Sequence, residues 1–100
     1  MKLGILVNTA RHLDDLVGIT RAALAKSHQV IIFIMDDGTR LLENQALVSL
    51  AGLEGVSLSL CDHSAKMHGV NAEGLSPKIV CGSQLNNAMM NHNADRVIVL

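Results

Sequence analysis

The chain has 100 residues, of which 49% are hydrophobic, and eight basic residues nearly balance nine acidic ones. A chain of this length fits one domain with its own core, so we expect a single domain over residues 1–100. The near-neutral charge, the lack of any Lys/Arg cluster and the presence of a single aromatic residue, Phe33, argue against nucleic-acid binding. No apolar run is long enough to cross a membrane and none has the features of an export signal, so we expect a cytoplasmic protein that does not bind membranes.

The first half of the chain predicts two strand–helix units. An apolar run over 2–7 predicts a buried strand, and helical spacing of apolar residues predicts a helix from about 11 to 27. The run over 29–35 is apolar on both faces, which is typical of a parallel strand covered by helices on both sides. After the polar turn Asp36–Gly38, the pattern predicts a second helix over about 40–51.

The second half continues the alternation. Apolar and small polar residues alternate over 56–60, which predicts a third strand, and a short helix over 62–68 is predicted to end at Gly69. The remaining strands are predicted at 78–81 and 96–100. Strands that alternate with helices indicate right-handed crossovers and hence a parallel sheet.

The last predicted helix follows Ser83, a residue suited to capping a helix N-terminus. Four residues at helical spacing are predicted to form its single apolar face: Leu85, Ala88, Met89 and His92.

Cys61 is the best candidate for chemistry, because it ends a predicted strand and precedes a predicted helix. Ligands bind at the carboxyl ends of parallel strands, and a helix N-terminus stabilises a thiolate. His63, Lys66 and His68 follow closely and are candidate binding groups, whereas the adjacent carboxylate of Asp62 opposes ionisation. The alternative interpretation is a buried, inert cysteine of the core.

Cys81 ends the predicted fourth strand in a similar position. If the third and fourth strands are neighbours, the two thiols lie at the same edge of the sheet, where they could relay sulfur or form a transient disulfide. The alternative is a small buried residue before a glycine turn. The two cysteines form no CxxC motif, and we expect free thiols in a reducing compartment.

Neither a metal site nor a cofactor site is expected. A site made from Cys61, His63, His68 and Cys81 is conceivable, but the two histidines are five residues apart, which does not place them on one helix face. The chain has no GxGxxG fingerprint and no P-loop, and the acidic turn Asp36–Gly38 is typical of a solvated turn.

Four groups of residues, in this order, resemble the DsrE/DsrF-like family, which includes the TusD-type sulfur-relay proteins. They are Ile5–Asn8 with Arg21–Ala25; Val30–Met35 with Asp37-Gly38; Leu58–Cys61 with Ala65 and Gly69-Val70; and Gly82 with Gln84-Leu85 and Ala94–Ile98. The resemblance covers nearly the whole chain. It departs from the family at His68, where Arg is common, and at Asp62 and His63, where small apolar residues are common.

This resemblance implies a three-layer α/β/α fold around a five-stranded parallel sheet. It also implies assembly into a homotrimer or homohexamer, and in relay members a persulfide on one cysteine, which corresponds to Cys61. Our leading hypothesis is therefore an intracellular sulfur carrier that takes sulfur from a donor protein and passes it to an acceptor protein. The alternatives are a non-catalytic oligomeric binding module, which would use the serine face of the third strand and Met89-Met90, and a metal-binding regulator.

Overall fold

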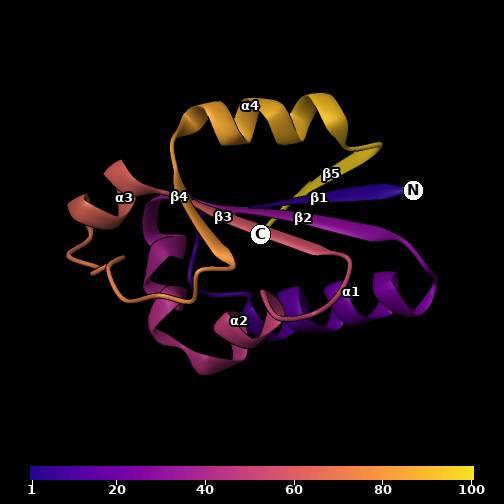
Figure 1. Ribbon diagram of the computed structural model, residues 1–100, viewed down its shortest axis with the longest axis horizontal. Coiled ribbons are helices and arrows are strands. Elements are labelled where there is room, and N and C mark those ends of the chain that lie inside the picture. Colours follow the sequence, from indigo (N-terminus) through magenta and orange to yellow (C-terminus); the bar gives the residue numbers. More distant parts are fainter.

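The computed structural model describes all residues, 1–100, as five strands and four α-helices with one 3₁₀ helix (Figure 1). The strands are β1 (Lys2–Val7), β2 (Gln29–Ile34), β3 (Val56–Cys61), β4 (Ile79–Gly82) and β5 (Arg96–Val99). The helices are α1 (Leu13–Ala25), η1 (Asp36–Glu43, the 3₁₀ helix), α2 (Gln45–Leu50), α3 (Asp62–Met67) and α4 (Gln84–Asn93). All strands predicted from the sequence are present, including the short β4.

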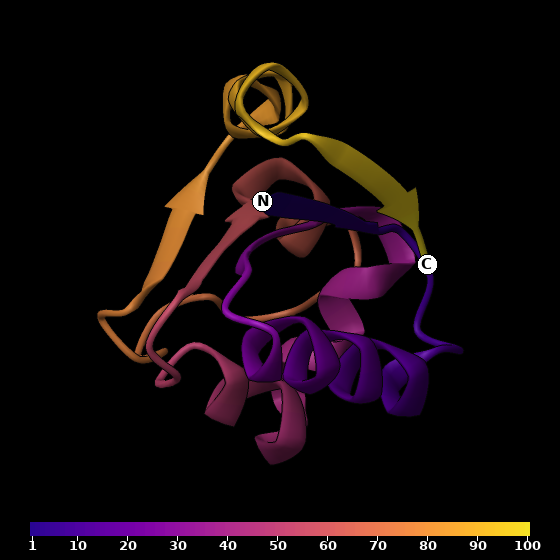
Figure 2. The same cartoon turned by 90° about the vertical axis from the view of Figure 1, so that its right-hand side faces the viewer.

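The five strands form one parallel sheet in the order β4-β3-β2-β1-β5. Helices cover both faces, so the predicted α/β architecture is confirmed. Figure 2 shows α4 end-on, on the opposite side of the sheet from α1 and α2. Because the carboxyl ends of all five strands point the same way, the sequence segments that follow β2, β3 and β4 meet at one edge.

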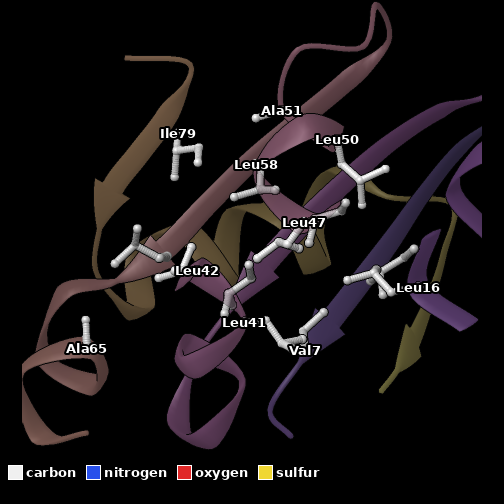
Figure 3. Packing of buried hydrophobic residues seen from close by; sticks show 14 of the residues in the cluster. Val7, Leu16, Leu41, Leu42, Leu47, Leu50, Ala51, Leu58, Ala65 and Ile79 are labelled. Atoms are coloured by element: carbon white, nitrogen blue, oxygen red, sulfur yellow. The ribbon is translucent and has the colours of Figure 1, made fainter. Parts of the chain in front are cut away.

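The main core lies between the sheet and the layer formed by α1, α2 and η1. Ile5, Ile32 and Leu58 from the sheet pack there against Leu16 and Leu47 from the helices, and all five are buried. Figure 3 shows the leucines of η1 and α2 in this layer. A second, smaller cluster of Phe33, Cys61 and Met90 lies on the α4 face.

The prediction of one continuous helix over about 40–51 is wrong. The chain forms η1 over Asp36–Glu43, and α2 begins only at Gln45. Asn44 separates them: its backbone is extended and its side chain accepts a hydrogen bond from the N–H of Ala46, so it caps a new helix. The break lets Leu41, Leu42 and Leu47 all reach the core, because a 3₁₀ turn places side chains differently from an α-helical turn.

The predicted apolar face of the last helix is also wrong. Leu85 is 66% exposed and Met89 is 53% exposed, whereas Met90 is buried against Phe33 and Cys61. The reason is topological. α4 connects β4 and β5, the two edge strands, and lies over the middle of the sheet against β1, β2 and β3, so it buries only one narrow stripe. The predicted cap at Ser83 is confirmed, and Asn86 completes a capping box with it.

Candidate functional site

Cys61 is the last residue of β3 and the N-cap residue of α3. Along β3 its side chain shares a face with Ser57 and Ser59, because alternate residues of a strand point the same way. This is the face that α4 covers, and Cys61 packs there with Phe33 and Met90. Only 3% of Cys61 is exposed, so any reaction of the thiol requires a covering side chain to move.

The surroundings of Cys61 favour its ionised form. Burial opposes ionisation, but hydrogen-bonding interactions with the hydroxyl and the N–H of Ser64, the side chain of Gln84 and the N–H of His63 outweigh it. Together they hold the pKa of the Cys61 thiol below its ordinary value. A thiol with a lowered pKa supplies more thiolate, the form that attacks sulfur.

Cys81 lies on the strand next to Cys61, as predicted, but its side chain points to the other face of the sheet. The register pairs Leu60 with Cys81 and Cys61 with Gly82. Register partners in a parallel sheet share a face, so Cys81 lies on the side of Leu60 and away from Cys61. Cys81 is exposed, and both cysteines are free.

Asp62 organises the surroundings of Cys81. The Cys81 thiol donates a hydrogen bond to Oδ1 of Asp62 at 3.3 Å, and Lys66 Nζ pairs with Oδ2 at 2.8 Å. Partial desolvation and the hydrogen bond to the Asp62 carboxylate raise the pKa of the Cys81 thiol. Lys66 and Cys81 in turn lower the pKa of Asp62. The two thiols therefore have opposite tendencies: Cys61 toward thiolate, Cys81 toward thiol.

The candidate binding residues near Cys61 take separate positions. Lys66 is engaged by Asp62, on the Cys81 side. His68 follows α3, and its Nδ1 lies 3.5 Å from Oδ1 of Asp37 in η1. His63 interacts with Cys61 through its backbone N–H. The structure thus brings Lys66 and Cys81 together around Asp62 and places His68 against η1.

The comparisons with known proteins concern the family and the fold. The sequence model of a family described as DsrE/DsrF-like matches residues 1–100. The chain belongs to the DsrE/DsrF-like family. A search of curated proteins gives no match. Among solved structures, the crystal structure of the YchN protein from E. coli is similar with a TM-score of 0.77 and 16% sequence identity, covering 100% of both chains. At this identity the likeness shows the fold, and it confirms the five-stranded architecture that the sequence resemblance implied.

Three residues of this DsrE/DsrF-like chain join the site without having been predicted: Met35, Ser64 and Gln84. Nε2 of Gln84 lies 3.7 Å from the sulfur of Met35, and both Gln84 and Ser64 lower the pKa of the Cys61 thiol. Ser64 stands three residues after Cys61 in the first turn of α3, a spacing visible in the sequence. Gln84 is 23 positions from Cys61 in the printed sequence and joins it only because β4 pairs with β3.

A groove with a volume of about 760 Å³ lies beside α4 in this DsrE/DsrF-like fold. Its floor includes Ser57 and Ser59 of β3 and Val80 of β4, and its wall includes Met89 and Met90. Ser57 and Ser59 precede Cys61 on the same face of β3, but Cys61 itself does not line the groove.

No group of three or more His, Cys, Asp or Glu residues is arranged to hold a metal ion. None of the helices has both the length and the apolar character that a membrane crossing requires.

Proposed function

We propose that this DsrE/DsrF-like protein is a sulfur carrier that holds sulfane sulfur as a persulfide on Cys61. The observation that carries the proposal is the position of the Cys61 thiol, at the carboxyl end of β3 and the N-cap of α3, where Ser64, Gln84 and the His63 N–H lower its pKa. Family membership supports the same chemistry, since the family includes sulfur-relay proteins.

The transfer follows the displacement chemistry of thiol–disulfide exchange. The Cys61 thiolate attacks the outer sulfur of a donor persulfide. The donor S–S bond breaks, a new S–S bond forms at Cys61, and the donor leaves as a thiolate. An acceptor thiolate then attacks the outer sulfur, and Cys61 leaves as a thiolate again. No net oxidation or reduction occurs, and the groups that stabilise the Cys61 anion act both at the start and at the end of the cycle.

Cys81 has a different role in this proposal. Its raised pKa and its hydrogen bond to Asp62 make it the poorer nucleophile of the two thiols. It lies at the same edge of the sheet but on the other face, so it is a candidate contact for a donor or acceptor protein. The proposal requires a compartment that keeps both thiols reduced, such as the cytoplasm.

Mass spectrometry tests the proposal directly. After incubation with a low-molecular-weight persulfide donor, we expect one added sulfur atom on Cys61 of the wild-type protein. The Cys81→Ser variant should accept sulfur normally, and Cys61→Ser should accept none. Equal loading of Cys61→Ser, or no loading of the wild type, would contradict the proposal.

We also propose that the protein assembles into a homotrimer or homohexamer through the exposed side of α4 and the edge strand β4. Val80, Leu85 and Met89 are each more than half exposed, and Val80 and Met89 border the groove beside α4. Clustered exposed apolar side chains mark interaction surfaces in soluble proteins. This patch also supports the alternative function, a non-catalytic oligomeric binding module, in which Cys61→Ser would change neither assembly nor binding.

Sedimentation analysis tests the assembly. We expect the wild type to sediment as a trimer or hexamer, and Met89→Glu to shift it toward the monomer. Met67→Glu is the matched control, because Met67 is 72% exposed but does not line the groove. A monomeric wild type, or an equal effect of the two variants, would contradict this interface.

A further inference from the structure

Gln84 connects two sulfur atoms at the carboxyl edge of the sheet. It is the first residue of α4, directly after the capping residue Ser83. Its Nε2 donates to the sulfur of Met35 at 3.7 Å, and its side chain also lowers the pKa of the Cys61 thiol. Met35 follows β2 and Cys61 ends β3, so Gln84 spans the ends of two neighbouring strands.

Gln84 can stabilise or destabilise the Cys61 thiolate, depending on which end of its amide faces the sulfur. The NH₂ group stabilises a thiolate, whereas the carbonyl oxygen repels it. In the structure Oε1 of Gln84 accepts a hydrogen bond from Nδ2 of Asn87 at 3.3 Å. The NH₂ group is therefore the end left to face Met35 and Cys61.

The orientation of Asn87 is set one turn further along α4. Nδ2 of Asn91 donates both to the backbone oxygen of Asn87 at 2.8 Å and to Oδ1 of Asn87 at 2.9 Å. A backbone oxygen can only accept, so Asn91 must present its NH₂ group. Asn87 must then present its Oδ1 to Asn91 and its NH₂ group to Gln84. One backbone carbonyl thus fixes the orientation of three side-chain amides in sequence.

We propose that Gln84 is the side-chain donor that stabilises the anionic sulfur of Cys61, and that Asn87 and Asn91 are positioning residues that keep its NH₂ group toward the sulfur. The inference rests on the proposed function for its use in sulfur transfer. The amide chain lies on one face of α4, at positions 84, 87 and 91, and leaves the buried Met90 to cover Cys61.

The pH dependence of Cys61 alkylation by iodoacetamide, measured in a Cys81→Ser background, tests the inference. The readout is the midpoint of the pH profile, because altered access changes the plateau rate but leaves the midpoint in place. Gln84→Leu should move the midpoint to higher pH and lower the rate near neutral pH by roughly tenfold, through loss of one hydrogen bond to a charged group. Gln45→Leu is the matched control: Gln45 is also an exposed glutamine that directly follows a helix cap, and it should leave the midpoint unchanged.

Two variants of Asn87 test the positioning role. Asn87→Ala frees the Gln84 amide and should raise the midpoint less than Gln84→Leu does. Asn87→Asp replaces the donor by an acceptor, so the NH₂ group of Gln84 turns toward residue 87 and its oxygen toward the sulfur. The midpoint should therefore rise more in Asn87→Asp than in Asn87→Ala.

An unchanged midpoint in Gln84→Leu, or equal midpoints in the two Asn87 variants, would overturn the inference. Circular dichroism of each variant verifies that α4 is retained. The inference and the proposed function fail separately. A shifted midpoint in a protein that accepts no sulfur refutes only the sulfur carrier, and sulfur loading with an insensitive midpoint refutes only the role of Gln84.

Discussion

Cys61 and Cys81 lie on neighbouring strands, yet their side chains point to opposite faces of the sheet. The cause is a register in which Leu60, and not Cys61, is the partner of Cys81. The two thiols therefore lie at the same carboxyl edge of the sheet but in different surroundings. Cys61 is buried beneath α4, and Cys81 is exposed beside Asp62.

This register predicts that the two thiols of one chain do not form a disulfide. A disulfide needs β-carbon atoms about 3.5–4.5 Å apart with converging directions, which side chains on opposite faces do not provide without backbone movement. Under mild oxidation, mass spectrometry should find no intrachain bond between Cys61 and Cys81. Rapid formation of that disulfide at neutral pH would contradict the prediction and would show that the edge of the sheet rearranges.

The pKa values of the two thiols should depart from the ordinary thiol value in opposite directions. The thiolate absorbance of Cys81→Ser reports Cys61 and should rise at lower pH than in an unfolded control. The absorbance of Cys61→Ser reports Cys81 and should rise at higher pH, because partial desolvation and Asp62 raise its pKa. The reverse order of the two titrations would contradict the assigned environments.

The same shifts predict how stability depends on pH. The pKa of Cys61 is lower in the folded chain, so its contribution is present above the unfolded thiol value of about 8.5 and is lost as the pH falls through the folded pKa. The pKa of Cys81 is higher in the folded chain, so its contribution is present below about 8.5 and is lost as the pH rises through the folded pKa. Denaturant unfolding between neutral and alkaline pH should show Cys61→Ser losing stability relative to wild type, and Cys81→Ser gaining it.

Met90 both packs the smaller core and covers Cys61. Met90→Ala should lower the free energy of unfolding by about 2–5 kcal/mol, because it leaves a cavity beside Phe33. It should also speed alkylation of Cys61 under conditions in which the protein stays folded. Met67→Ala, at an exposed position, should change stability by less than about 0.5 kcal/mol. Unchanged alkylation in Met90→Ala would mean that another side chain controls access.

Gly38 and Gly18 can be compared as sites for a Gly→Ala substitution, because the space around them differs. A β-carbon at Gly38 would lie 2.5 Å from the backbone oxygen of Val7, whereas one at Gly18 would meet nothing within 4 Å. Gly38→Ala should destabilise the fold by about 1–3 kcal/mol, since the obstacle is backbone that cannot move aside. Gly18→Ala, in an exposed turn of α1, should stabilise it by about 0.4–1 kcal/mol. Thermal unfolding of the two variants should therefore shift in opposite directions.

The sequence by itself determined the order of strands and helices and the position of Cys61 at a strand end. These features are local: the apolar run of β2, the alternation in β3 and the cap at Ser83 are each set by neighbouring residues. The family resemblance also implied the number of strands.

Only the tertiary structure decided what surrounds the thiols. The break at Asn44 and the burial of Met90 in place of Leu85 depend on which face of the sheet each helix must cover, and a local pattern carries no such information. The effect of Gln84 on Cys61 and the separation of Cys81 from it both follow from the pairing of β4 with β3. Strand register acts between residues far apart in the chain, and it is register that gives the two cysteines their different chemistry.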